Sequence, residues 1–295
     1  MVRPFSLLIA AFALAASGIA HGQDTLSPQR GSVELSSANA SLELGRDFAF
    51  YGPEDTRRIV VDIWENPPTE ADGVLGLVMP AGSSPRDRSW GALVTWEPVG
   101  WVSADDARSA DYDALMREMQ SEARDRNAQG RGDGFAAVKV VGWAQRPAYD
   151  SVAHAVSWAR TLRFADAEDD PDTLHYDVRI LGRYGVLSLN IVGDETQLPE
   201  IREAARELKS RVQFAPGARY EDFDRESDDV AGYGIAGLVA SGAGLAVAKN
   251  LGVFAVLAKL AQPIGAALLV LALALATPFR RIFRKAGKAG KPATR

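Results

Sequence analysis

The chain of 295 residues contains no cysteine. No disulfide can therefore brace it, no lipid can be attached through a thiol, and no thiolate can serve as a nucleophile or metal ligand. Its stability must come from an ordinary hydrophobic core. The stretch of about 200 residues between its two apolar ends is long enough for one domain that buries roughly 70% of its surface.

Histidine is scarce and the common catalytic motifs are missing. Of three histidines, His21 lies in the N-terminal apolar region, which leaves His154 and His175 for acid–base or metal chemistry. The sequence has no H-E-x-x-H, no G-x-S-x-G and no P-loop. "GYGIAG" at 232–237 matches a dinucleotide fingerprint, but no buried strand precedes it and no later acid could hold a ribose. We therefore expect no cofactor.

Acidic residues are absent from the last part of the chain. Residues 23–229 carry all 38 Asp and Glu against 23 Lys and Arg, a net charge of −15. Residues 230–295 carry nine Lys and Arg and no acid. A strongly acidic body repels phosphates, so nucleic acid is excluded as a partner. The asymmetry indicates instead that the two parts lie in different compartments.

The N-terminus has the pattern of a secretory signal peptide at 1–22. Arg3 provides a minimal basic flank, residues 5–16 form an apolar core, and small residues follow. The apolar core is too short for a bilayer, which needs about 20 apolar residues. An uncleaved anchor is the alternative, and in both cases the acidic body is exported.

The C-terminus predicts a transmembrane helix followed by a cytoplasmic tail. Residues 257–279 are the best span, and the tail at 280–295 carries seven cations. Arg280, Arg281, Arg284 and Lys285 directly follow the span and serve as the topology anchor under the positive-inside rule. We expect a single-pass protein of the bacterial inner membrane, with the lipid bilayer as partner and the soluble domain in the periplasm.

A second apolar segment, at 230–248, is glycine-rich and weakly hydrophobic. Small residues recur every four positions along it, at Gly232, Ala236, Ala240, Gly244 and Ala248. Such a stripe allows close helix packing, so we expect an interfacial or partly inserted helix that packs on the span or on a second copy. Composition alone can also produce the stripe. If both segments crossed the bilayer, the basic tail would lie outside, against the charge rule.

The exported body, 23–229, reads as α+β, with helices packed on a largely antiparallel sheet. Helical patterns cover 53–64, 109–130 and 196–214. Strand patterns cover 73–80, 90–102, 155–164, 174–181 and 184–193. Short connections between successive strands predict antiparallel pairing. Alternation in the later strands predicts one apolar face and one polar face.

Two groups of polar residues are candidate sites. His175, Arg179 and Arg183 are the polar candidates for a ligand or acid–base site, and a solvated or cross-strand cluster is the alternative for them. The loop at 166–172 offers Asp166, Glu168, Asp170 and Asp172 as candidate metal ligands, although a solvated turn between two strands is the better explanation of them. An EF-hand is excluded, because Pro171 stands where that loop requires glycine.

The chain resembles a bacterial family of predicted membrane-anchored proteins, domain of unknown function 2167. Two segments carry the resemblance, the W-x-x-x-P-x-Y-D box at 143–150 and the L-G-R-x-G-V-L-S-L-N box at 181–190. The resemblance implies a membrane anchor and no assigned activity. More distantly, three strands followed by a helix and Phe214 resemble the α/β/α sandwich of photosystem oxygen-evolving subunits and Mog-like folds.

Two functions stay open from the sequence. The first is a non-enzymatic envelope protein, a periplasmic recognition or scaffolding domain that pairs with a second copy or another envelope protein. The second is a small-ligand-binding or enzymatic domain with its site near His175, Arg179 and Arg183.

Overall fold

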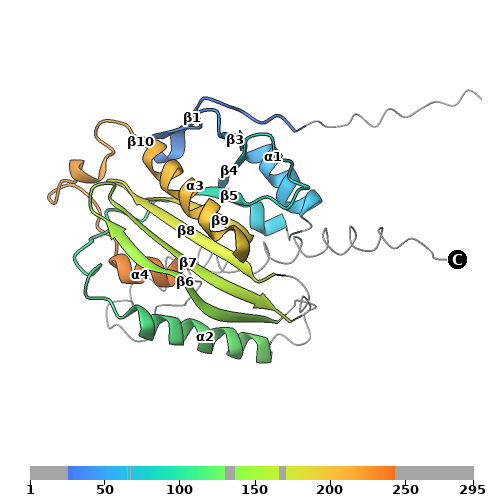
Figure 1. Cartoon of the computed structure of the whole chain (residues 1–295). Coiled ribbons are helices and arrows are strands. Elements are labelled where there is room, and N and C mark those ends of the chain that lie inside the picture. Colours follow the sequence, from blue (N-terminus) through green and yellow to red (C-terminus); the bar gives the residue numbers. More distant parts are fainter. Residues whose placement is uncertain (1–25, 65, 67, 130–136, 166–170, 243–295) are drawn as a thin grey trace, which may run out of the picture.

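The computed structural model describes residues 26–64, 66, 68–129, 137–165 and 171–242. The predicted signal peptide, the span at 257–279 and the basic tail lie outside the described residues. The described part is α+β, and its largest element is a fully antiparallel sheet of seven strands in the order β3-β4-β5-β9-β8-β7-β6. Figure 1 shows helix α3 on one side of this sheet and helices α2 and α4 on the other.

The strands of the large sheet are β3 (Phe48–Tyr51), β4 (Val74–Pro80), β5 (Gly91–Glu97), β6 (Val138–Asp150), β7 (Ala155–Phe164), β8 (Thr173–Leu181) and β9 (Val186–Asp194). The helices are α1 (Pro53–Arg57), α2 (Tyr112–Gln129), α3 (Leu198–Arg211) and α4 (Ile235–Gly242). A π-helical turn, η2 (Arg58–Ile63), continues α1, and short 3₁₀ turns are η1 (Ser36–Ala38), η3 (Pro68–Ala71), η4 (Glu195–Gln197) and η5 (Tyr220–Asp222).

A small second sheet and α3 together cover one face of the large sheet. β1 (Ser32–Leu35), β2 (Ala40–Glu43) and β10 (Val212–Phe214) form this three-stranded antiparallel sheet. Ile201 and Leu208 of α3 pack with Leu42 of β2 against apolar side chains of β8 and β9. The sequence did not predict β1 and β2, since their Ser-rich stretch reads as irregular chain.

Helices cover the opposite face as well. Near one edge, Ile59, Val60 and Trp64 of the α1–η2 helix pack on Leu77 and Leu93 of the strands. Toward the other edge, α2 and α4 pack on strand residues, including Val156, Trp158, Leu181 and Val186. Layers of helix, sheet and helix follow, as in the predicted sandwich. Both faces of the large sheet are therefore covered.

Most predicted elements are found close to their predicted limits. The helices predicted at 53–64, 109–130 and 196–214 are α1 with η2, α2 and α3, and the three later strands are β7, β8 and β9. Asp111 caps α2, since its carboxylate accepts from the backbone N–H of Asp113 and Ala114 at 3.1 and 2.9 Å. The strand predicted at 90–102 ends at Glu97, because Pro98 has no N–H to donate.

β6 is an edge strand of the large sheet, and a side chain of α2 occupies hydrogen-bonding groups of its backbone. The side chain of Asn127 accepts from the backbone N–H of Val138 at 3.1 Å and donates to its carbonyl at 2.7 Å, as a neighbouring strand would. Irregular register between Gln145 and Ala148 surrounds Pro147, a residue that sheets tolerate at edges and bulges. Pro147 thus lies inside a strand, at one of its irregular positions.

The turn between β8 and β9 leaves no room for a side chain at Gly185. Gly182 donates to the carbonyl of Gly185 at 2.8 Å, which closes a tight hairpin. A Cβ atom on Gly185 would lie 2.1 Å from the backbone oxygen of Glu97. We expect Gly185→Ala to lower the free energy of unfolding by about 1–3 kcal/mol, because the backbone of β5 would have to shift.

The matched control for that substitution is Gly142→Ala in β6, where an added Cβ meets nothing within 4 Å. Urea unfolding of both variants and the parent protein measures the difference. Equal stability of the two variants would contradict the close approach of β9 to β5.

The chain beyond β10 docks on the domain rather than leaving it. Trp101 stacks between Tyr220 and Phe223, with ring centroids 4.9 and 4.3 Å away. Further on, the carboxylate of Asp106 accepts from the N–H groups of Ile235 and Ala236 at 2.7 and 3.1 Å, which caps the start of α4. The folded part therefore continues past the predicted boundary at residue 229, through α4.

No described helix is both long and apolar enough to span a bilayer.

Candidate functional site

The face of the large sheet that α1, η2, α2 and α4 cover carries a band of polar side chains in its middle. We define the polar band as Thr95 and Glu97 of β5, Ser188 and Asn190 of β9, His175, Asp177 and Arg179 of β8, and Arg160 of β7. Strand register makes these residues neighbours on one face. Arg179 lies opposite Ser188, which lies opposite Thr95, and Asp177 lies between Asn190 and Trp158.

Arg179 is the centre of the polar band. Its Nη1 donates to Glu97 Oε1 at 2.8 Å and to Ser188 Oγ, and its Nη2 lies 3.4 Å from Asp177 Oδ1. The other carboxylate oxygen of Asp177 accepts from Arg160 Nη2 at 3.3 Å. The guanidinium of Arg179 also lies over the Trp158 ring, 5.7 Å from its centroid. Two arginines and two carboxylates thus form one continuous network across four strands.

The network is withdrawn from water. Arg179 is 2% exposed, Asp177 4% and His175 5%. Burial of charges costs several kcal/mol per ion, and their pairing offsets this cost only when geometry is good. Of the two alternatives for His175, Asp177 and Arg179, a solvated cluster or a cross-strand cluster, the structure shows the cross-strand one, because the face on which they lie is covered. The network is a buried cross-strand cluster.

Several buried polar atoms of this face have no hydrogen-bond partner. They are Thr95 Oγ1, Trp158 Nε1, His175 Nε2, Arg179 Nε and Asn190 Nδ2. Each such atom costs about 1–3 kcal/mol, so native proteins hold few of them. Burial, with the charge of Arg160 nearby, lowers the pKa of His175 to about 3, which keeps its ring neutral at physiological pH. Five unpartnered atoms on one sheet face require an explanation.

The polar band lies between two apolar clusters. On the side of β5, Leu93 and Val192 pack under η2, and on the side of β7, Val156 and Trp158 pack with α4. Tyr233, just before α4, lies near Glu97. Burial and the charge of this carboxylate raise the pKa of the Tyr233 hydroxyl. The chain just before α4 therefore covers the end of the polar band at which Glu97 lies.

Arg183 does not join the band. It lies in the β8–β9 turn, where its Nε and Nη2 donate to the two carboxylate oxygens of Asp228 at 2.6 and 2.9 Å. Its Nη1 donates to the carbonyl of Gly217 at 3.2 Å. This bidentate pair fastens the segment before α4 to the sheet. Of the three predicted ligand-binding residues, the structure brings His175 and Arg179 together and assigns Arg183 a structural contact.

The predicted metal ligands fall mostly outside the described residues. Asp166, Glu168 and Asp170 are among those not described. Asp172 is paired with Arg163, whose Nε and Nη2 donate to its two oxygens at 2.8 and 2.6 Å. Within the described ranges, no group of three or more His, Asp or Glu could hold a metal ion.

A family model described as a protein of unknown function, DUF2167, matches residues 27–275. The chain belongs to this family. The match confirms the resemblance drawn from the two sequence boxes, and it covers α4 together with the sheet. No curated protein matches the chain.

One solved structure similar to this DUF2167 chain is the solution structure of cyanobacterial PsbP from Synechocystis. Its sequence identity is 10%, and the match covers 68% of this chain and 99% of that one, with a TM-score of 0.34.

The small-residue stripe of this DUF2167 chain is only partly described. Ala240 is buried in the domain's own core, Ala236 is half-buried and Gly232 is exposed. Gly244 and Ala248 lie outside the described residues. On α4, the apolar side chains of Ile235, Leu238 and Val239 face the sheet. This part of the segment packs on its own domain.

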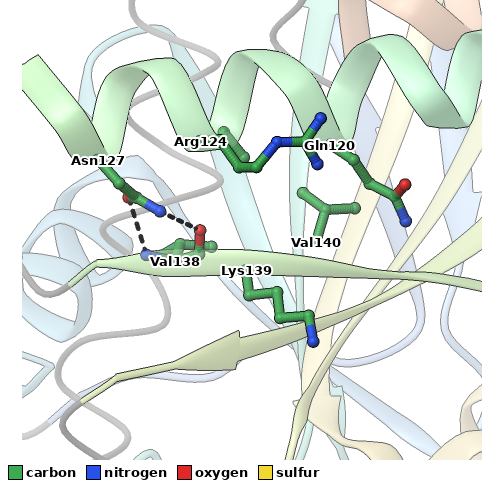
Figure 2. A pocket seen from close by; sticks show the side chains of 7 residues that line it. Gln120, Arg124, Asn127, Val138, Lys139 and Val140 are labelled. Carbon is green, nitrogen blue, oxygen red and sulfur yellow. Dashed lines mark hydrogen bonds between the residues drawn. The ribbon is translucent and has the colours of Figure 1, made fainter.

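A hollow of about 260 Å³ lies between α2 and β6. Figure 2 shows Arg124 reaching over Val140, whereas Lys139 points away from the helix, toward the other face of the sheet. Asn127 uses its amide on the backbone of Val138. The two cations therefore do not converge on one ligand, and the hollow is a weaker candidate than the polar band.

Sequence reasoning missed Glu97, Arg160, Ser188 and Asn190 as members of the polar band. Arg160 shares the face of Trp158 by strand alternation, a signal that was present in the sequence. The pairing of Arg179 with Glu97, 82 residues earlier, depends on the order of the strands. No local pattern reports that order.

Proposed function

We propose that this DUF2167 chain is an envelope protein held in the bacterial inner membrane by one C-terminal helix, with its α+β domain in the periplasm. The observation that carries the proposal is the partition of charge. All acids precede residue 230, and seven cations follow the apolar run that ends at 279. Under the positive-inside rule this distribution favours a cytoplasmic tail and an exported domain.

The described structure supports a tether close to the domain. The chain docks through α4 up to Gly242, and residue 257 begins the best span. The intervening 14 residues contain Lys249 and Asn250, which suit the water-facing side of a bilayer. The domain therefore stands near the membrane surface, where it recognises or scaffolds a second copy or another envelope protein.

Reporter fusions after Arg295 test the topology. We expect a fluorescent reporter that folds only in the cytoplasm to be active, and a phosphatase that works only in the periplasm to be inactive, because the cations hold the tail inside. Replacing Arg280, Arg281, Arg284 and Lys285 with glutamine should produce mixed orientations.

The matched control replaces Lys288, Lys291 and Arg295, which lie farther from the end of the span and have less influence on its orientation. Periplasmic phosphatase activity in the unsubstituted fusion would overturn the proposed placement.

A second candidate function is binding of a small ligand by the polar band. The specific observation in its favour is the set of five buried polar atoms that lack partners on that face. A bound molecule would remove their cost, as ordered water or a ligand does at other buried polar sites. Of the predicted site, this second candidate function includes His175 and Arg179 but not Arg183.

A further inference from the structure

We infer that the polar band binds a small uncharged molecule that presents carbonyl or hydroxyl oxygens. The inference rests on the second candidate function above and names its ligand class. Three features carry it: the position of the unpartnered atoms, their hydrogen-bonding character and the charge balance of the network around them.

The unpartnered atoms belong to adjacent positions of one surface. Asn190 and Trp158 flank Asp177 on the two neighbouring strands, and Arg179 is the next residue of β8 on the same face. The Arg179 guanidinium lies over the Trp158 ring, with its central carbon 5.7 Å from the ring centroid. Trp158 is fully buried and Arg179 is 2% exposed. Because the atoms lie at adjacent positions of one face, one small molecule bound among them would contact several of them.

The free hydrogen-bonding capacity is mainly that of donors. Arg179 Nε, Trp158 Nε1 and Asn190 Nδ2 each carry a hydrogen and have no acceptor. Meanwhile the carboxylate oxygens named in the network already accept from arginine. A ligand that fits must supply acceptors, which oxygens of carbonyl and hydroxyl groups provide.

The charge balance argues against an anion. Arg160 and Arg179 are matched by Asp177 and Glu97, so the polar band is neutral without a ligand. An added anion would place an unmatched charge in a buried site and would compete with both carboxylates for the same arginines. An uncharged acceptor satisfies the donors and leaves the ion pairs intact.

Indole NMR signals of the full-length protein in detergent test the inference. Labelling tryptophan alone with ¹⁵N gives six indole signals, and Trp158→Phe identifies the one from the polar band. The probes are acetamide and acetate, which have nearly the same shape and differ in charge, together with glycerol and phosphate. We expect acetamide and glycerol, but not acetate or phosphate, to shift the Trp158 signal.

Two other indoles serve as internal controls. Trp64 Nε1 donates to the Pro85 carbonyl and Trp90 Nε1 to Glu200 Oε1, both at 2.8 Å, so their signals should stay in place. Trp158→Phe should weaken acetamide binding about threefold to tenfold, the effect of one lost neutral hydrogen bond, measured from the backbone amide signal of Tyr233 in a second sample labelled with ¹⁵N-tyrosine. Trp90→Phe should leave the affinity unchanged.

The outcomes separate the ligand class from the binding function. If acetate or phosphate shifts the Trp158 signal and acetamide does not, the ligand class is wrong and the polar band remains a binding site. If none of the four probes shifts the Trp158 signal, and this indole N–H exchanges hydrogen with bound water alone, the inference and the small-ligand function both fail.

Discussion

Asp177→Asn should lower the free energy of unfolding by about 3–5 kcal/mol, since it removes one charge from a buried network. Asp177 accepts from both Arg160 and Arg179 and is 4% exposed. Asparagine has the same shape but no charge, so Arg179 would keep Glu97 as its carboxylate partner, whereas Arg160 would lose the charge of Asp177. The uncompensated positive charge, rather than a lost volume, causes the effect.

Two comparisons make this expectation specific. Glu203→Gln breaks an ion pair with Arg206 that is largely exposed, and it should cost less than about 1 kcal/mol. The double variant Arg160→Met, Asp177→Leu removes one charge of each sign, so it should be less destabilised than Asp177→Asn alone. Urea unfolding of the purified protein in detergent measures all three. An Asp177→Asn variant as stable as Glu203→Gln would refute the network as a source of stability.

The sequence predicts five of the seven strands of the large sheet, all but β3 and β6, because the signals of those five are local. Alternating residues in β7, β8 and β9, together with the two-residue turn around Arg183 and Tyr184, determine both strand type and antiparallel pairing. Whether a polar face is solvated is a different question. It depends on α2 and α4, which cover that face from distant parts of the chain, so the sequence left open whether His175 and Asp177 are solvated or lie in a buried cross-strand cluster.

Only those members of the candidate site that a local pattern connects could be grouped from the sequence. His175 and Arg179 share one face of one strand, and alternation alone shows this. Glu97 joins them because β9 lies between β5 and β8 in the sheet. Arg183 was grouped with them by closeness in sequence, yet it belongs to a turn and pairs with Asp228.

The predicted character of α4 shows how an apolar segment can be read in two ways. Ile235, Leu238 and Val239 would suit a membrane interface as well as a protein core. The contact that places this helix in the protein core is made by Asp106, which accepts from the helix start. Asp106 precedes the two donating residues by 129 and 130 positions in the chain. Composition contains no information on that contact.

Stability should depend on pH through two buried groups that act in opposite directions. Glu70 is 2% exposed and neither carboxylate oxygen has a partner, so burial, with Asp72 nearby, raises its pKa from 4.5 to about 8. The folded protein therefore binds a proton that the unfolded chain releases between pH 4.5 and 8. Stability falls as pH rises through this window, by roughly 2–5 kcal/mol in total.

His175 has the opposite sign. Its pKa in the folded protein is about 3, against 6.5 for an unperturbed histidine, so the unfolded chain binds the extra proton between these values. Stability falls as pH drops from 6.5 toward 3. Between pH 4.5 and 6.5 the two effects cancel, and above 6.5 only that of Glu70 remains. We expect a plateau from about pH 4.5 to 6.5 and a decline toward pH 8.

Glu70→Gln separates the two contributions, because glutamine keeps the shape and cannot ionise. In this variant, stability should rise from pH 4.5 to 6.5 through His175 alone and should stay level up to pH 8. Introducing His175→Gln as well should flatten the profile between pH 4.5 and 8. Urea unfolding in detergent at half-unit intervals of pH gives each curve. A Glu70→Gln protein that still loses stability above pH 6.5 would show that a group other than Glu70 titrates there.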